Sequence, residues 1–222
     1  MTATINNVAR QTLTEMAYDE ILRAIETGLL KAGEKINEST LAKNLGISRF
    51  PVREALRALE KIGLVTFEPF KGVRVTPVTN AHMKDILQVH FSLEEMSIRL
   101  MMTNLTPERL AVLDGCILGM RQSTNTVDLI NADLGFHKAV CTFSGNGPLL
   151  TTWLPLASHI RVCMHAGVPL FDDREDFIQA HAGLLDFIKS GDVEQAVLAM
   201  RRHFHIRIDN LTVAPELGLA EA

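Results

Sequence analysis

One aspartate and three histidines of this 222-residue chain are spaced so that they could bind a metal ion. Asp133 and His137 are four residues apart in a helical pattern, so both would project from one face of a helix. His181 and His203 lie ten residues before and twelve residues after Gly191, where a turn would make two helices antiparallel neighbours. The two imidazoles can then meet at similar height. One carboxylate and three imidazoles inside a helical bundle suit zinc, nickel or manganese.

A second set of charged residues belongs to a helical segment nearer the N-terminus. Its arginines recur at i, i+4 and i+8 and share one face: Arg49, Arg53 and Arg57. Its apolar residues fall on another face: Val52, Leu56 and Leu59. A solvated face on an ordinary amphipathic helix is the alternative interpretation. The helix and turn before it favour DNA, because the N-terminal end of such a helix reaches base edges in the major groove.

Local signals predict how this helix is positioned. Ser48 is a candidate N-cap whose hydroxyl would accept a backbone N–H, and Pro51 fits the first helical turn. Gly63 is expected to end the helix, since glycine tolerates positive φ. A shorter helix from Ser39 to Asn44 should precede it and turn at Gly46.

Two short strands are expected after the arginine helix. Leu64–Phe67 and Val73–Val75 have strand character, and Glu68–Gly72 forms the turn between them. Lys71 and Arg74 place positive charge on this wing, which could reach a phosphate or the minor groove. A lysine suits a phosphate, whereas an arginine fork suits guanine. Residues 1–77 are therefore predicted to form a winged helix-turn-helix DNA-binding domain.

The remainder of the chain contains helical patterns without strand-like alternation or repeats. Six segments are expected, with approximate bounds 80–104, 107–122, 127–143, 149–165, 172–190 and 192–211. Pro155 should kink the fourth segment or start it afresh. Short connections favour an antiparallel bundle. The fold class is therefore mostly α: a winged helix-turn-helix with a small β wing, followed by an all-α antiparallel six-helix bundle over residues 78–222.

Charge and apolar content limit the class of protein. Residues 1–77 carry 11 basic and 9 acidic residues, whereas the rest carries 11 and 17, so a net +2 segment precedes a net −6 body. Positive charge is thus concentrated where the arginines are. No apolar run reaches the roughly 18 residues of a membrane span, and the first residues contain no apolar h-region, so secretion is not expected. The three cysteines are expected to be buried thiols. These observations predict a cytoplasmic protein with no membrane partner.

The N-terminal segment resembles the GntR family of bacterial transcription regulators. The resemblance is carried by ESTLAKNLGI, SRFPVREAL, EKIGLV and FKGVRV, where the family usually has SRTPVREAL. Phe50 replaces the usual threonine, so packing against a sugar or a thymine methyl would take the place of a backbone contact. The resemblance implies DNA contacts at six positions: Lys43, Ser48, Arg49, Arg53, Lys71 and Gly72.

Residues from about 80 to 210 resemble the FCD (FadR-type) effector domain of that family, an all-helical bundle. ADLGFHKAV, SGNGPLL and AHAGLLDFIKSGDVEQAVLAMRRHF carry this resemblance. Many members hold a divalent metal with one aspartate and three histidines. The resemblance maps this set, with zinc as the first candidate and nickel or manganese as others, onto Asp133, His137, His181 and His203.

The expected effector contacts are less uniform. The family usually has an arginine that helps to hold a carboxylate effector, with a glutamate four residues later, where this chain has His90 and Glu94. His90 could act as a weaker substitute, it could join the metal site, or the ligand could differ. Arg161 is a second candidate for an anionic ligand, and a surface or salt-bridging role is its alternative.

Together these patterns predict a metabolite-responsive transcription regulator. A homodimer would bind a short inverted repeat in double-stranded DNA, and a small organic acid bound near the metal would change operator binding through residues 76–80. Relief of repression is the commoner arrangement in the family, and activation is the other. One alternative has a structural metal or a metal-free apolar effector pocket. Another is a metal-dependent hydrolase, but no acid–base partner accompanies the four ligands, so no enzyme is expected.

Overall fold

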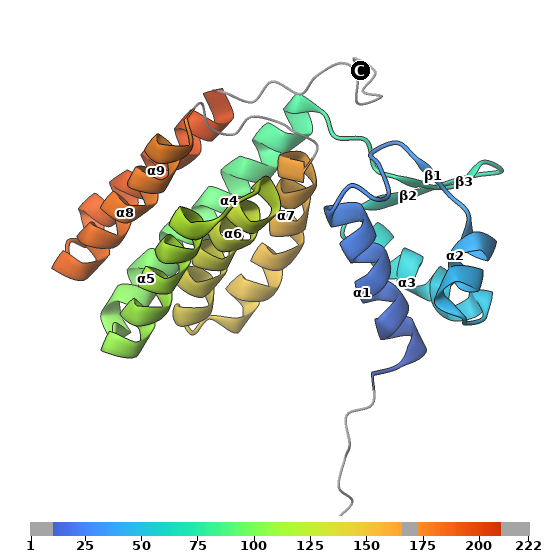
Figure 1. The fold of residues 1–222 in the computed structure, drawn as a ribbon, viewed down its shortest axis with the longest axis horizontal. Coiled ribbons are helices and arrows are strands. Elements are labelled where there is room, and N and C mark those ends of the chain that lie inside the picture. The colour runs from blue at the N-terminus through green and yellow to red at the C-terminus, as the bar shows by residue number, and fades with distance from the viewer. Residues whose placement is uncertain (1–10, 166–172, 210–222) are drawn as a thin grey trace, which may run out of the picture. The chain divides into compact units, whose positions relative to one another are not determined.

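The structure, a computed structural model, describes residues 11–165 and 173–209, with side chains up to Phe204. The chain divides into two compact units, Met1–Thr76 and Pro77–Ala222. Figure 1 shows the first unit as helices with a small sheet and the second as long helices only. The expected last residues of the C-terminal helix, 210–211, and the first residue of the preceding one, 172, lie outside the described residues.

The first unit combines three helices with three short strands in the part that is described. The elements are α1 (Leu13–Glu26), β1 (Lys35–Ile36), α2 (Glu38–Leu45), α3 (Arg49–Lys61), β2 (Val65–Glu68) and β3 (Gly72–Val75). The sequence patterns had not indicated α1 or β1. A capping box between Thr12 and Glu15 starts α1, because the threonine accepts from the glutamate N–H and the glutamate accepts from the threonine N–H. Helix α1 packs along α3.

Helix α3 begins and ends close to the expected residues, but its N-cap differs. Ser48 occupies the N-cap position, yet among the described residues its hydroxyl makes no capping hydrogen bond. The third helical residue is Pro51, which has no N–H to donate, so the usual capping partner does not exist. The expectation of a hydroxyl cap was wrong. Gly63 follows the helix with φ 78°, in the left-handed region as expected.

The wing is part of a three-stranded antiparallel sheet with strand order β1-β3-β2. In its register Lys35 of β1 and Thr66 of β2 both pair with Arg74 of the central strand β3. Apolar residues of the sheet are buried: Ile36, Val65, Val73 and Val75. The sheet therefore joins the wing to the helical core, and β1 places Lys35 beside it.

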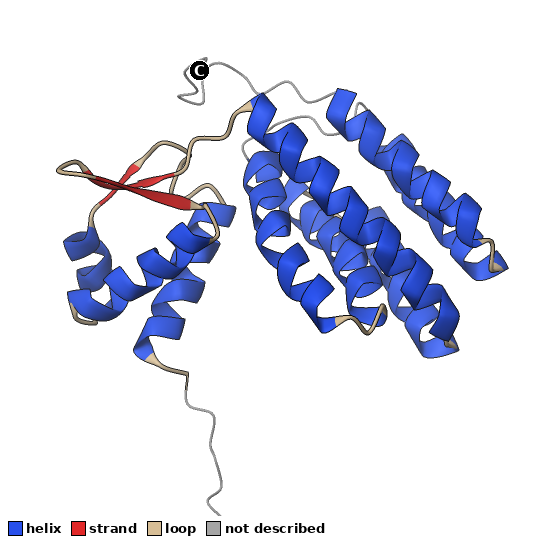
Figure 2. Cartoon of the chain, turned by 180° about the vertical axis from the view of Figure 1, so that it is seen from behind, coloured by secondary structure: helices blue, strands red, loops and turns tan. Residues whose placement is uncertain are grey.

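The second unit consists of long helices, as Figure 2 shows. They are α4 (Asn80–Met101), α5 (Pro107–Gln122), α6 (Thr126–Phe143), α7 (Gly147–His165), α8 (Arg174–Ser190) and α9 (Val193–Asp209), with a 3₁₀ turn η1 (Met102–Asn104) after α4. Helix α4 packs against α6, α7 and α9. Helices α8 and α9 are joined at Gly191, whose φ of 78° reverses the chain.

Helix α7 runs through Pro155 as one element, so the expected fresh start does not occur. Proline removes one backbone donor. The helix is nevertheless held along its length, since Leu149, Trp153, Ala157 and Ile160 are buried where it packs on α4 and α6. Across the described residues, no helix is both long enough and apolar enough to traverse a lipid bilayer.

Candidate functional site

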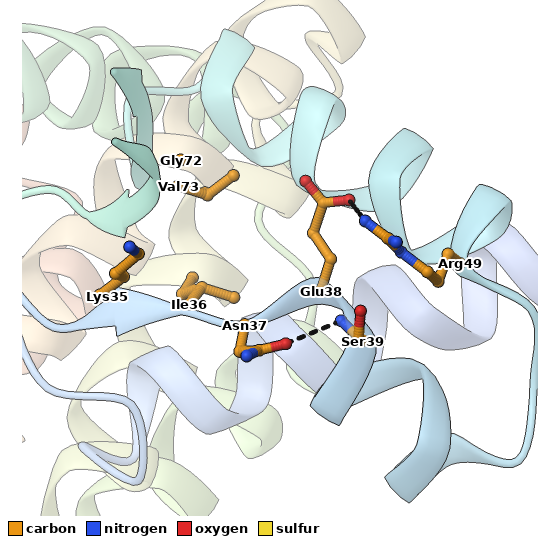
Figure 3. A pocket seen from close by; sticks show the side chains of 8 residues that line it. All are labelled: Lys35, Ile36, Asn37, Glu38, Ser39, Arg49, Gly72 and Val73. Atoms are coloured by element: carbon orange, nitrogen blue, oxygen red, sulfur yellow. Dashed lines mark hydrogen bonds and ion pairs between the residues drawn. The ribbon is translucent and has the colours of Figure 1, made fainter. Parts of the chain in front are cut away.

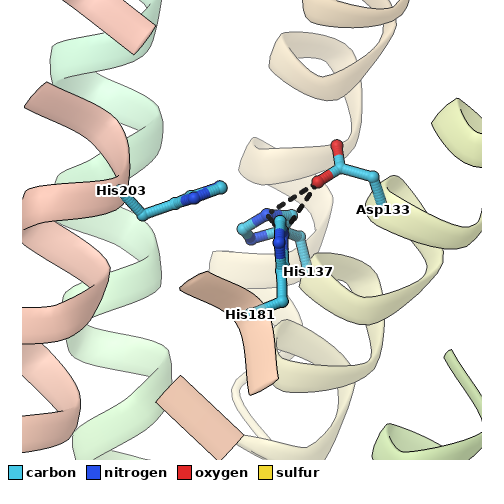
Figure 4. Close-up of side chains that lie close together, drawn as sticks. All are labelled: Asp133, His137, His181 and His203. Carbon is cyan, nitrogen blue, oxygen red and sulfur yellow. Dashed lines mark hydrogen bonds and ion pairs between the residues drawn. The ribbon is translucent and has the colours of Figure 1, made fainter. Parts of the chain in front are cut away.

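Four side chains converge inside the second unit. Helix α6 provides Asp133 and His137, α8 provides His181 and α9 provides His203. One potential ligand atom from each lies within 4.8 Å of the other three, and all four residues are buried. Figure 4 shows the carboxylate and the rings turned toward one another. Residues from three separate helices thus meet at one point.

The separations between these atoms suit a shared cation. Asp133 Oδ1 is 2.9 Å from His181 Nε2 and 3.4 Å from His137 Nε2. The two Nε2 atoms are 3.4 Å apart. Ligand atoms in a tetrahedron around a zinc ion with bonds of about 2.0–2.1 Å are roughly 3.3–3.4 Å from each other. The ring centroid of His203 lies 4.3 Å from that of His181. The residues present therefore fit a divalent metal.

The second nitrogen of two rings is engaged away from the centre. His181 Nδ1 is 2.8 Å from the carbonyl oxygen of Phe177, to which its N–H donates. His137 Nδ1 is 2.5 Å from Glu94 Oε2 and donates to that carboxylate. When each ring is neutral, the remaining nitrogen, Nε2, is then a lone-pair donor turned toward the other ligands. Outer partners of this kind fix the tautomer and orientation of metal-binding histidines.

Glu94 of α4 was noted beside His90 in the sequence, but the sequence patterns assigned it no role at the site. Its side chain is fully buried, and its Oε1 accepts a hydrogen bond of 2.9 Å from Trp153 Nε1 and lies 3.2 Å from His90 Nδ1. Burial raises the pKa of Glu94, but His137 and His90 lower it further, so the net shift is downward. Burial lowers the pKa of His137, and the carboxylates of Glu94 and Asp133 raise it to about 9. A charged residue on the apolar face of the expected helix was the available signal.

The two candidate effector residues differ in position. His90 is fully buried, with its ring centroid 5.0 Å from that of Trp153. Among the described residues, the group of converging ligand atoms does not include His90. Arg161 of α7 is half-buried and donates a hydrogen bond to Asn131 Oδ1 of α6. Neither residue is one of the four converging ligands.

The three arginines of α3 differ in their contacts. Arg49 is exposed and lies 3.5 Å from Glu38, as Figure 3 shows. Arg53 is exposed as well. The guanidinium of Arg57 instead stacks 3.6 Å from the ring centre of Phe67 in β2 and pairs with Glu60. The spacing predicted that the three arginines share one face. Arg49 and Arg53 are exposed on that face, whereas the guanidinium of Arg57 is turned onto Phe67.

A hollow of about 490 Å³ lies between β1, the start of α2, the start of α3 and the wing. Arg49 and Gly72, two of the predicted DNA contacts, line it together with Lys35 of β1, which the sequence patterns had not singled out. Figure 3 shows these residues around the opening. The other four predicted contacts are exposed on α2, before and on α3, and on the wing: Lys43, Ser48, Arg53 and Lys71.

Comparison with protein families accounts for both units. Residues 13–75 match the model described as bacterial regulatory proteins, gntR family, and residues 85–205 match the FCD domain. The chain belongs to the GntR family of transcription regulators. Its FCD domain identifies the branch of the family, and this match covers more than half of the chain.

Two sequence relatives of this GntR regulator align over about nine tenths of their length. YdhC of Bacillus subtilis, an HTH-type transcriptional regulator, is 27% identical over 90% of this chain and 92% of its own. The probable D-xylose utilization operon transcriptional repressor of Paenarthrobacter nicotinovorans is 27% identical over 91% and 90%. The structure of Escherichia coli McbR/YncC shares the fold, with a TM-score of 0.79 and 24% identity over 89% of this chain and 96% of that one. These relatives are transcription regulators, so the hydrolase alternative is not supported and the chain is not an enzyme.

Proposed function

We propose that this GntR-family regulator is a metal-dependent, metabolite-responsive switch of operator binding. Its FCD domain holds a divalent ion through Asp133, His137, His181 and His203, and a small organic acid bound beside that ion changes the affinity of the first unit for DNA. The observation that carries the proposal is the buried convergence of these four ligands from three helices.

Charge balance supports a divalent ion at this centre. Asp133 and Glu94 are fully buried carboxylates, and the histidines around them are neutral when Nε2 acts as a ligand. Two uncompensated buried anions would each cost several kcal/mol, on the order of the penalty for a desolvated ion. One divalent cation neutralises both. Imidazole with carboxylate favours zinc first, and nickel or manganese are the alternatives.

An organic acid is the ligand class that a buried cation attracts. Its carboxylate would lie at the ion, and His90 and Arg161 are the candidates to hold the rest of the molecule. Burial of all four protein ligands also favours a second candidate function, a closed structural metal that binds no effector. The two functions differ in whether an acid alters operator binding.

On the DNA side, the exposed arginines of α3 are assigned to the major groove. Arg49 and Arg53 would contact base edges, because they lie at the N-terminal end of the helix. The wing and the neighbouring elements would contact the phosphate backbone through Lys43, Ser48, Lys71 and Gly72. Lysines and backbone N–H groups position a protein on DNA without reading its sequence.

A homodimer on a short inverted repeat fits a symmetric regulator of this size. Helix α4 offers a surface for it, because four apolar residues at i, i+4, i+7 and i+11 are exposed or only partly buried among the described residues: Val89, Leu93, Met96 and Leu100. Val89 and Met96 are each about half exposed, at 50% and 51%. Repression is the proposed sense of regulation, as the name of the Paenarthrobacter relative states for that protein.

The metal is tested on the purified full chain. Elemental analysis should find about one divalent ion per chain, and His181→Ala should remove it. His82→Ala is the matched control, since His82 is an exposed histidine of the same unit and should leave the ion bound. Retention of stoichiometric metal by the His181 variant would refute the site.

The effector is tested by operator binding with and without small organic acids, using DNA selected in vitro with the wild-type chain. An acid that shifts the dissociation constant of the metal-loaded protein, and not that of chelator-treated protein, supports the switch. A metal-loaded protein that no acid affects, across a panel of mono- and dicarboxylates, supports the structural function instead.

A further inference from the structure

Glu94 contacts three side chains, which belong to three helices, beside the proposed metal ligands. From α4 it reaches His137 of α6 through Oε2 and Trp153 of α7 through Oε1, and it lies beside His90 of its own helix. All of these residues are buried. A carboxylate is rarely buried so completely unless its oxygens are hydrogen-bonded, as both are here.

The two oxygens have different partners, and this determines what His137 can do. Trp153 can only donate through its indole N–H, so Oε1 must accept. Oε2, an acceptor when the group is ionised, requires the proton of His137 to be on Nδ1. In the neutral ring that binds a metal, Nε2 of His137 is then the nitrogen without a proton, and it lies 3.4 Å from Asp133 Oδ1. The tautomer follows from the acceptor.

We infer that Glu94 is a positioning residue of the metal centre, which fixes the ring orientation and tautomer of His137 so that Nε2 is presented to the ion. It does not contact the metal itself. Trp153 has a secondary part, since its N–H holds the carboxylate in the rotation that serves His137. This inference rests on the proposed metal centre and adds a residue from α4 to a set drawn from α6, α8 and α9.

A purely structural role is the competing explanation. In that case Glu94 would only tie α4 to α6 and α7 through buried hydrogen bonds, and its loss would weaken the fold without changing how the metal is bound. The distinction is measurable, because a positioning role predicts a change in metal affinity and in the ligand field of the bound ion.

Glu94→Gln is the decisive variant because it keeps the size of the side chain but leaves one acceptor. An amide whose oxygen accepts from Trp153 presents NH₂ to His137, which favours a proton on Nε2 and blocks that ligand. The affinity for zinc, measured by competition with a chromogenic chelator, should fall about 10- to 100-fold. The absorption bands of the cobalt(II)-substituted protein should also shift, since one imidazole is withdrawn.

Glu95→Gln is the matched control. Glu95 is the next residue of the same helix, but it pairs with Arg99 and Arg201 at the surface. This variant should bind zinc and cobalt as the wild type does. If metal-free Glu94→Gln does not fold, as judged by circular dichroism, Glu94→Asp replaces it, because the shorter carboxylate keeps the charge but cannot span both partners. It should then show the lower affinity and the shifted cobalt bands.

The outcomes separate this inference from the function on which it rests. Wild-type protein that binds no divalent ion would overturn the metal centre itself. Wild-type protein that binds zinc, together with a Glu94 variant of unchanged affinity and unchanged cobalt spectrum, would overturn the positioning role and leave the metal centre intact. A variant that is only less stable, with the same affinity and spectrum, also overturns it.

Discussion

Arg53 and Arg57 provide a sharp test of the DNA-binding surface, because they lie one helical turn apart on the same face of α3 but differ in their contacts. Arg53 is exposed, and its side chain takes part in no ion pair or stack that the described residues show. Arg57 stacks on Phe67 and pairs with Glu60. Arg53→Ala should therefore impair DNA recognition, and Arg57→Ala should mainly reduce stability.

The expected magnitudes follow from these contacts. An arginine that makes a bidentate contact with guanine contributes about 1 to 3 kcal/mol of discrimination, so Arg53→Ala should weaken operator binding roughly 5- to 150-fold per half-site. The exposed cation–π contact of Arg57 is worth about 0.5 to 1 kcal/mol. Arg57→Ala should thus lower the free energy of unfolding by an amount of that order and change operator affinity far less.

Fluorescence anisotropy measures both variants on the selected operator and on a scrambled duplex of the same composition, at two salt concentrations. Arg53→Ala should lose affinity for the operator and little for the scrambled DNA. Equal losses on the two duplexes would make Arg53 a phosphate contact. A loss for Arg57→Ala as large as that for Arg53→Ala would refute the assignment made from the stacking contact.

Three further predictions concern the second unit and the metal-free chain. Met96→Glu places a charge on the apolar surface of α4 and should shift the chain toward monomer in sedimentation; an unchanged dimer would exclude this surface. In metal-free protein, burial lowers the pKa of His137, but nearby carboxylates raise it from 6.5 to about 9. The protonated His137 therefore stabilises the folded state fully below about pH 6.5, and this contribution is lost as the pH rises through about 9. The melting temperature of chelator-treated protein should fall across that window, and zinc-loaded protein should not show this fall. Gly191→Ala should destabilise the folded state by about 1 to 2 kcal/mol, because φ is 78° at this residue. Gly183→Ala should stabilise it by up to about 1 kcal/mol, because Gly183 lies inside α8 with open space at Cβ. Thermal melts in which the two variants do not shift the melting temperature in opposite directions would contradict this expectation.

Local patterns were sufficient to predict most helices and to place the four candidate ligands as two pairs, and the family resemblance joined the two pairs into one set. The turn at Gly191 fixes α8 and α9 as neighbours, and the i, i+4 spacing fixes Asp133 and His137 on one face. Strand β1 was not predicted, because a strand of two residues is too short to show an alternation of apolar and polar residues. It exists through pairing with β3, where Lys35 meets Arg74 across a long sequence separation.

The remaining features depended on tertiary contacts that sequence spacing does not contain. Glu94 reaches partners 43 and 59 residues away in the sequence, so its hydrogen bonds to them could not be inferred from the pattern of its own helix. A charged residue at that position is ordinarily assigned to the surface. The stack of Arg57 on Phe67 was missed for the same reason, since spacing locates Cβ atoms but not the far end of a long side chain.

The contact between Trp153 and Glu94 gives the molecule a built-in optical reporter. Trp153 is the sole tryptophan of the chain, and its buried indole N–H is bonded to the carboxylate that holds His137. The centroid of the His90 ring lies 5.0 Å from that of the indole, so both rings belong to the same buried cluster. Intrinsic emission of the unlabelled protein therefore reports on the interior of this one site. A titration with metal or organic acid can be followed in the native chain, with DNA present or absent.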